Sequence, residues 1–208
     1  GKIYCAPLTA RSVLVIDPSA GSTSLLGDFG DSFGKWCPGV QGPDRRLYFA
    51  PYHASSILVV DPATQAVSLV GDFGDTPHKW DPGVIGPDGR LYFAPANARE
   101  ILVIDPLSHS YALIGDLGPG EYKWNRGVCG IDGVLYFAPW NTGAILVIDA
   151  LPRWSPATHA SFSPWHRKCV KLLLLARQRQ DCLLHLLPHG VLVSRVLPFM
   201  GRHWFSKP

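Results

Sequence analysis

The chain has 208 residues, 47% of them apolar, which is enough for one ordinary domain with an appendage and excludes a wholly disordered chain. Its 21 glycines and 19 prolines favour short strands joined by tight turns over a helical protein. The net charge of +3 hides a division: residues 1–150 carry 10 Lys/Arg and 15 Asp/Glu, whereas residues 151–208 carry nine Lys/Arg and a single acid. We therefore treat residues 1–150 and 151–208 as separate regions.

A 44-residue repeat runs through residues 1–150 without an insertion or a deletion. Four residue types mark its register: Tyr4, Tyr48, Tyr92 and Tyr136; Pro7, Pro51, Pro95 and Pro139; Asp17, Asp61, Asp105 and Asp149; and Trp36, Trp80 and Trp124. A fixed period of this length is the signature of repeat architectures, in which each copy forms one supersecondary unit and stacks on the next.

Each complete copy is predicted to contain four strands, as residues 79–117 illustrate. Residues 81–87 form a short extended segment that ends at Pro87-Asp88-Gly89, where each residue type favours a tight turn. Strands are then predicted over residues 91–94, 101–104 and 111–114, which are rich in types that suit a pleated sheet. No segment of the repeat has apolar residues at the period of a helix. Residues 36–75 and 80–118 are complete copies, residues 1–31 lack the first strand, and residues 124–149 stop after the third.

The third strand is apolar at every position in Ile101-Leu102-Val103-Ile104, so both of its faces need to be covered. Four antiparallel strands whose sheet is buried between two neighbours describe a blade of a β-propeller. The sequence therefore predicts an all-β fold. It is a partial β-propeller of about three and a half four-stranded antiparallel blades over residues 1–150, followed by a non-repeat tail over residues 151–208.

The segment from Pro82 to Ala94, with Asn97 and residues 101–105 after it, resembles the NHL repeat, a propeller blade of similar length. One position departs from that family's pattern, since Pro95 stands where its repeats usually carry an acid. Pyrroloquinoline-type, kelch and WD-repeat blades have a similar Asp-Pro turn and are the alternative relatives. The resemblance covers residues 1–150 only and implies a six-bladed ring, which would need about 264 residues at this period.

The repeats in residues 1–150 are therefore not expected to close such a ring by themselves. Three arrangements stay open: the sequence is a fragment, two chains combine, or the blades form an open arc. The first and last blades would expose unpaired strand edges, which predicts low stability or self-association.

Residues 151–208 break the repeat, and two interpretations of them stay open. They are either the product of mis-splicing or a shifted reading frame, with at most one helix over residues 168–187, or a basic appendage for an acidic partner or a membrane surface. His166-x-x-Cys169 and Cys182-x-x-His185 have zinc-ligand residue types in an order that does not match a zinc finger. The longest apolar stretch, residues 170–176, is too short to span a bilayer. The five cysteines indicate no disulfide framework.

A Lys-Trp pair precedes the first strand of each copy and is the main candidate for ligand contact. The propeller resemblance places these pairs and the Pro-x-Asn loops on one face of the ring. The candidate residues are Lys35, Trp36, Lys79, Trp80, Lys123, Trp124, Asn97 and Asn141. A repeated aromatic residue beside a cation and an acid can stack on a sugar and hydrogen-bond its edges. In the structural alternative, the tryptophans pack between blades while the lysines and the neighbouring acids face water.

The recurring aspartates Asp17, Asp61, Asp105 and Asp149 end the third strands. Four acids on a ring could bind cations. A turn-forming aspartate that accepts hydrogen bonds from its own backbone explains them better, and we predict that role.

The chain has no Ser/His/Asp set, glycine-rich phosphate loop or metalloprotease motif. Gluconolactonase-like enzymes share the six-bladed fold and hold a central metal with Glu, Asn and Asp, but only Glu100, Glu121 and three asparagines are present here. Because the copies are nearly equivalent, we predict a non-catalytic scaffold that binds a protein or a glycan through its loop face, without cofactor, metal or nucleic acid. The alternative is a fragment of a propeller enzyme, either a gluconolactonase-like hydrolase or a quinone-cofactor enzyme. The sequence indicates no compartment.

Overall fold

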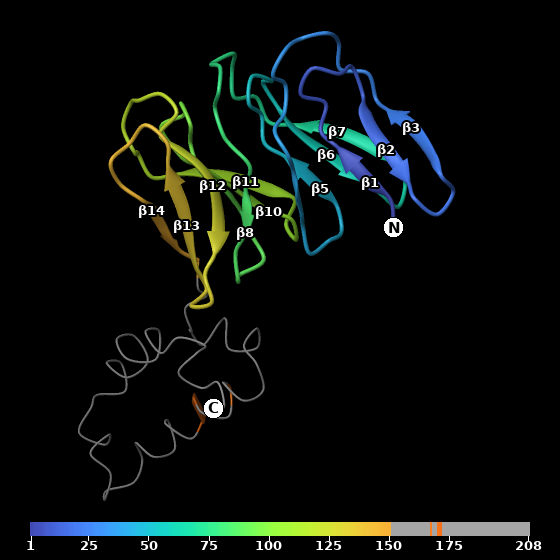
Figure 1. Ribbon diagram of the computed structural model, residues 1–208. Coiled ribbons are helices and arrows are strands. Elements are labelled where there is room, and N and C mark those ends of the chain that lie inside the picture. Colours follow the sequence, from blue (N-terminus) through green and yellow to red (C-terminus); the bar gives the residue numbers. More distant parts are fainter. Residues whose placement is uncertain (151–166, 168–169, 172–208) are drawn as a thin grey trace, which may run out of the picture. The chain divides into compact units, whose positions relative to one another are not determined.

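The computed structural model describes residues 1–150 together with residues 167, 170 and 171, and the chain falls into two units, residues 1–150 and 151–208. Every regular element within residues 1–150 is a β-strand. The strands form four antiparallel sheets, one for each copy of the repeat, which we call blades 1 to 4 (Figure 1). The predicted all-β fold with one sheet for each repeat is confirmed.

The blades take their strands in chain order. Blade 1 consists of β1 (Ile3–Cys5), β2 (Val13–Asp17) and β3 (Ser22–Leu26). Blade 2 consists of β4 (Val40–Gln41), β5 (Leu47–Phe49), β6 (Ile57–Asp61) and β7 (Ala66–Val70). Blade 3 consists of β8 (Val84–Ile85), β9 (Leu91–Phe93), β10 (Ile101–Asp105) and β11 (Ser110–Ile114). Blade 4 consists of β12 (Trp124–Cys129), β13 (Val134–Pro139) and β14 (Leu146–Asp149). Among the described residues, blade 1 lacks the first strand and blade 4 the fourth, as predicted.

The turn after the first strand forms as the Pro-Asp-Gly sequence predicts. Gly89 has a φ of +83° and donates its N–H to the carbonyl of Gly86 at 2.9 Å. The carboxylate of Asp88 accepts a 2.8 Å hydrogen bond from the hydroxyl of Tyr92. The same contact recurs between Tyr48 and Asp44 and between Tyr136 and Asp132. The recurring tyrosine therefore fixes the turn to the second strand.

The recurring aspartates close the turn after the third strand. Asp61 Oδ1 accepts hydrogen bonds from the backbone N–H groups of Ala63 and Thr64, at 2.9 and 3.4 Å. Asp17 and Asp105 accept the corresponding bonds in blades 1 and 3. The bond from Ala63 holds the pKa of Asp61 below its ordinary value. The turn role is confirmed for these three residues.

The hydrophobic core lies between the blades. We call the side of a blade that packs on the next blade its front face and the opposite side its back face. Between blades 2 and 3, the front-face residues are Tyr48, Ala50, Ile57 and Val59, and the back-face residues are Trp80, Leu91, Phe93, Leu102 and Ile104. Equivalent residues join blades 3 and 4 and blades 1 and 2. Residues 101–104 of β10 alternate between the two faces and are all buried, which is why each of these four positions is apolar.

The predictions for the tail lie outside the described residues, apart from Val170 and Lys171 in the expected helix. This applies to the remainder of that helix over residues 168–187 and to the His166/Cys169 and Cys182/His185 pairs. Within the described part of the chain, no helix is both long enough and apolar enough to cross a membrane. Cys5, Cys37 and Cys129 are free thiols.

Candidate functional site

The segments that precede the first strands and the loops that follow the second strands lie on one face of the array, as the resemblance implied. A chain of backbone hydrogen bonds of 2.8–3.0 Å joins them from blade to blade. It runs through Leu8, Lys35, Tyr52, Lys79, Ala96, Lys123 and Trp140. We call this side of the array the loop face. Since its loops are bonded to one another directly, side chains of different blades are held in a fixed relation.

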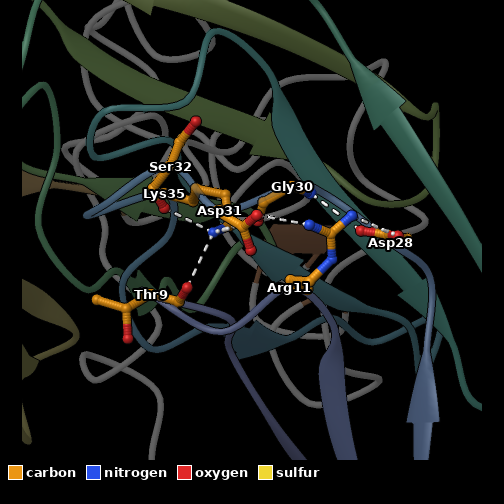
Figure 2. Close-up of polar contacts among 7 residues, drawn as sticks. All are labelled: Thr9, Arg11, Asp28, Gly30, Asp31, Ser32 and Lys35. Atoms are coloured by element: carbon orange, nitrogen blue, oxygen red, sulfur yellow. Dashed lines mark hydrogen bonds and ion pairs between the residues drawn. The ribbon is translucent and has the colours of Figure 1, made fainter.

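The three candidate lysines are buried beneath the loop face. Lys35 Nζ donates to the carbonyl oxygens of Ser32, Gly30 and Thr9, at 2.6, 3.0 and 3.4 Å (Figure 2). Lys79 makes the three equivalent bonds, and Lys123 donates to the carbonyl oxygens of Ala98 and Gly120. Burial lowers the pKa of Lys79 and Lys123. The expectation that these lysines face water is wrong, because main-chain carbonyls replace the water around each ammonium group.

The acids near these lysines lie on the surface. Beside Lys35, the guanidinium of Arg11 binds the carboxylates of Asp28 and Asp31 at 2.8 and 2.6 Å (Figure 2). Arg99 binds Asp116 in the same way in blade 3. The side chains of these ion pairs are more than half exposed, so solvent screening leaves each pair with little effect on stability.

The three candidate tryptophans pack between blades. The indole Nε1–H of Trp80 donates to the carbonyl of Glu100 at 2.8 Å, and the ring of Phe73 packs edge-on to it with centroids 5.1 Å apart. Trp36 and Trp124 make the equivalent hydrogen bonds. All three rings are buried to the same extent as Tyr48 and Tyr92. This burial favours packing over direct stacking on a ligand.

The two candidate asparagines occupy the edge of the loop face. Asn97 Oδ1 accepts a 2.8 Å hydrogen bond from the backbone N–H of Tyr122, and its own N–H donates to the carbonyl of His78. Asn141 is exposed, and its Nδ2 lies 3.4 Å from the carbonyl of Glu121. Asn97 therefore secures the junction between blades, whereas Asn141 is open to solvent.

A row of aromatic side chains crosses the loop face from blade 1 to blade 4. We call the following six residues the aromatic row: Phe33, His53, Tyr52, His78, Tyr122 and Trp140. Neighbouring ring centroids lie 4.3–5.9 Å apart. Phe33 and Trp140, at the two ends, are 68% and 49% exposed. The four rings between them are partly exposed, so the row presents a continuous aromatic surface to solvent.

Two histidines stand at the middle of this row. His53 Nε2 lies 3.3 Å from His78 Nδ1, so the two rings share a hydrogen bond. Tyr52 stacks on His53 with an interplanar angle of 12° and meets His78 edge-on. Burial, followed by the charge of His53, lowers the pKa of His78. The charged form of His78 is therefore disfavoured relative to that of an ordinary histidine.

The sequence did not identify the aromatic row because its members do not recur with the period. Tyr52 and Trp140 occupy a position held by leucine and alanine in the other copies. His78 and Tyr122 occupy another, held by glycine in blade 1. One pattern in the sequence could have indicated the row. Aromatic residues stand directly before the recurring Lys-Trp pairs and directly after the recurring prolines.

A buried carboxyl group stands where the first strand of blade 3 begins. Asp81 Oδ2 has no hydrogen-bond partner among the described residues, and burial raises the pKa of Asp81 to about 6. Burial, with a contribution from the negative charge of Asp81, also raises the pKa of both Cys37 and Tyr52 to about 12. This position differs between copies, with Cys37 in blade 2 and Asn125 in blade 4. Within the described residues, no group of three or more His, Cys, Asp or Glu side chains could hold a metal ion.

Comparison with known proteins gives a match at the level of the fold. No family profile and no curated protein sequence matches the chain. Among solved structures, 72% of the chain superposes on virginiamycin B lyase from Staphylococcus aureus, with a TM-score of 0.55 and 14% identity. For a streptogramin B lyase, 72% of the chain superposes with a TM-score of 0.57 and 17% identity. For a nidogen/laminin complex, 71% of the chain superposes with a TM-score of 0.52 and 14% identity.

The array is an arc of a β-propeller. The chain spans about half the length of these relatives: 52% of the virginiamycin B lyase, 48% of the streptogramin B lyase and 55% of the nidogen/laminin chain. At identities this low the likeness establishes the fold, and fold alone does not assign function.

Proposed function

We propose that the chain is a non-catalytic binding module whose loop face holds a protein ligand. The observation that carries this proposal is the aromatic row, a continuous run of rings with exposed ends at Phe33 and Trp140. Aromatic residues are enriched in the buried centres of protein interfaces, where they supply much of the binding energy. Four such residues in a row with two histidines on one loop face are therefore typical of a binding surface.

The shape of the loop face supports a protein over a glycan. A sugar stacks on the flat face of an aromatic ring, but the flat face of His53 is covered by Tyr52. A hollow lined by Phe33, His53 and Asp75, among other residues, lies at the blade 1 end of the row. Such a hollow suits a single side chain of a partner protein. The nidogen/laminin complex is a precedent for a propeller relative that forms a protein complex.

The recurring candidates have a supporting part in this proposal. The buried ammonium of Lys79 holds the loops that carry Tyr52 and His78. The indole of Trp80 holds the carbonyl of Glu100, at the end of the loop that precedes β10. Lys35, Trp36, Lys123 and Trp124 hold the neighbouring loops. Asn141 is exposed next to Trp140, and we assign it to the rim of the binding surface.

Selection from a displayed random-peptide library on the folded chain tests the proposal. Peptides that bind should lose at least about tenfold in affinity when Trp140 or Phe33 is replaced by alanine, because an aromatic side chain that anchors an interface is worth more than about 1.4 kcal/mol. The matched control is Leu107→Ala, a 73% exposed residue in the turn after the third strand of blade 3. Peptides that bind all variants equally would reject the loop face. A glycan-array ligand that depends on Trp140 would assign the surface to sugars instead.

Asp81 supports a second candidate function, that of an enzyme. A catalytic propeller should have polar residues unique to one blade, and the position of Asp81 is filled by Cys37 and Asn125 in the neighbouring blades. Its pKa of about 6 suits a general acid or base near neutral pH. Lactone hydrolysis followed in a pH-stat tests this candidate. The enzyme candidate would be established by a sugar lactone that the wild-type protein hydrolyses and the Asp81→Asn variant does not. Equal hydrolysis by wild type and variant would show that Asp81 has no catalytic role.

A further inference from the structure

Blades 1 and 3 each carry an arginine on the loop face at a position where blade 2 carries a serine. Arg11 and Arg99 are two periods of the repeat apart, and Ser55 lies midway between them. In blade 1 two nitrogens of the Arg11 guanidinium bind two carboxylates, Asp31 at 2.6 Å and Asp28 at 2.8 Å (Figure 2). Arg99 binds the first acid of its own loop in the same way. An arginine at this position therefore neutralises acids of the loop face.

Blade 2 keeps both acids without the arginine. Asp72 and Asp75 stand one period after the two acids that Arg11 binds, and both are exposed. Neither forms an ion pair with any residue in the described part of the chain. In blade 1 the guanidinium of Arg11 and the ammonium of Lys35 together balance the two acids. In blade 2 the ammonium of Lys79 is present and the guanidinium is missing, which leaves an excess negative charge.

The backbone of blade 2 holds its two acids as blade 1 holds the equivalent pair. The N–H of Phe73 donates to the carbonyl of Ser55 at 2.7 Å, and the equivalent bond in blade 1 is also 2.7 Å. Asp72 Oδ1 accepts the N–H of Gly74 at 3.1 Å, the same distance as in blade 1. Lys79 Nζ binds two carbonyls of the loop at 2.6 and 2.9 Å, against 2.6 and 3.0 Å in blade 1. Blade 2 therefore has the arrangement that binds a guanidinium in blade 1.

The hollow at the blade 1 end of the aromatic row opens at this position. Its lining includes Ser55 and Asp75, with Phe33 and His53 from the row, and its volume is about 280 Å³. Phe33 is 68% exposed, and the face of an aromatic ring attracts a cation. Lys35 also lines the hollow, but its ammonium group is bound to three main-chain carbonyls. The hollow thus combines an aromatic ring, a carboxylate and space for a side chain that blade 2 lacks.

We propose that this hollow binds an arginine side chain of the protein ligand, with the guanidinium on Asp72 and Asp75 and the side chain against Phe33. The proposal rests on the proposed function, because it requires that the loop face bind a protein. The repeat supplies the comparison, since the same two positions bind the guanidinium of Arg11 in blade 1. Arginine is favoured over lysine because its planar group donates to two carboxylates at once and stacks on aromatic rings, whereas an ammonium group is a compact point charge.

Two displayed peptide libraries test the proposal, one with arginine and one with lysine as its only basic residue. The arginine library should give the tighter binders to the full chain by at least about tenfold, and replacing the arginine with uncharged citrulline should cost about the same. Ser55→Arg should remove this dependence on arginine, because the introduced side chain then binds the two aspartates. The matched control is Thr64→Arg, at an exposed residue of the turn after β6, which should leave binding unchanged. Far-UV circular dichroism verifies that each variant is folded.

An NMR titration of the isotope-labelled full chain with N-acetyl-arginine methylamide tests the hollow without a protein ligand. At ~10 mM the probe should shift the amide signal of Gly74 in wild type and not in Ser55→Arg. No shift in wild type, an equal shift with N-acetyl-lysine methylamide, or a shift retained in Ser55→Arg would overturn the proposal. Peptides that depend on Trp140 and need no arginine would also overturn it, while leaving the proposed function in place. If no peptide bound the loop face, the proposed function and this proposal would both be rejected, because the occupant would then not belong to a protein.

Discussion

Replacing Asp81 with asparagine should make the stability of the protein less dependent on pH. The carboxyl group is 6% exposed, its Oδ2 has no hydrogen-bond partner among the described residues, and burial raises its pKa from 3.8 to about 6. Because the pKa is higher in the folded state than in the unfolded state, the folded protein binds the proton more tightly. The resulting stability is fully present below about pH 4 and is lost as pH rises towards about 6.

The size of this effect follows from the two pKa values. Their difference corresponds to about 3 kcal/mol, since a tenfold change in the proton-binding constant is worth about 1.4 kcal/mol. An asparagine cannot ionise, and the repeat accepts one at this position, since blade 4 has Asn125 there. The free energy of unfolding of Asp81→Asn, minus that of wild type, should therefore be about 2–3 kcal/mol larger at pH 7.5 than at pH 4.

Urea unfolding followed by tryptophan fluorescence at the two pH values measures this difference. The matched control is Asp75→Asn, the same change on an exposed loop residue. A difference for Asp81→Asn that does not change with pH would refute the reasoning, because it would mean that the buried carboxyl group titrates alike in the folded and unfolded states.

Three further measurements test the roles assigned to the loop face. Lys79→Met should lower the free energy of unfolding by roughly 2–4 kcal/mol because two close main-chain carbonyls lose their donor, whereas Lys2→Met on an exposed residue should have no measurable effect in urea unfolding. Trp80→Phe should cost about 1–2 kcal/mol by removing one buried hydrogen bond, and an unchanged value would show that the bond contributes nothing. His78 should titrate below the ordinary histidine pKa of 6.5 in an NMR titration of its ring, and a midpoint above 6.5 would contradict its burial.

Most of the fold could be predicted from the sequence because the period and the turn residues restrict each other. Strands predicted over residues 91–94, 101–104 and 111–114 correspond to β9, β10 and β11 within a residue. The first strand is shorter than predicted, with only Val84–Ile85 regularly paired. The pairing is interrupted between that strand and the Trp80–Pro95 bridge, at the position where blade 4 has a register shift between Trp124 and Gly127.

The environment of the lysines could not be predicted from residue type. Lysine is among the residues least often buried, so a Lys-Trp pair gives no indication of a buried ammonium group. What buries Lys35 is the course of the backbone, which brings the carbonyls of Gly30 and Ser32 to its Nζ. The geometry of those carbonyls depends on a loop with positive φ values at Gly30 and Gly34, which repeat spacing alone does not specify.

Recurrence in this chain reports packing more directly than ligand contact. The residues that recur in every copy, such as Trp80 and Asp61, each satisfy a contact that every blade needs, either to its neighbour or within its own turn. Residues free of that requirement can differ between blades, and the aromatic row occupies such positions. The similarity of the copies, which favoured a scaffold over an enzyme, was thus judged mainly on residues that make packing and turn contacts. The positions that break the repeat, from His78 on the loop face to Asp81 below it, therefore carry the evidence on function.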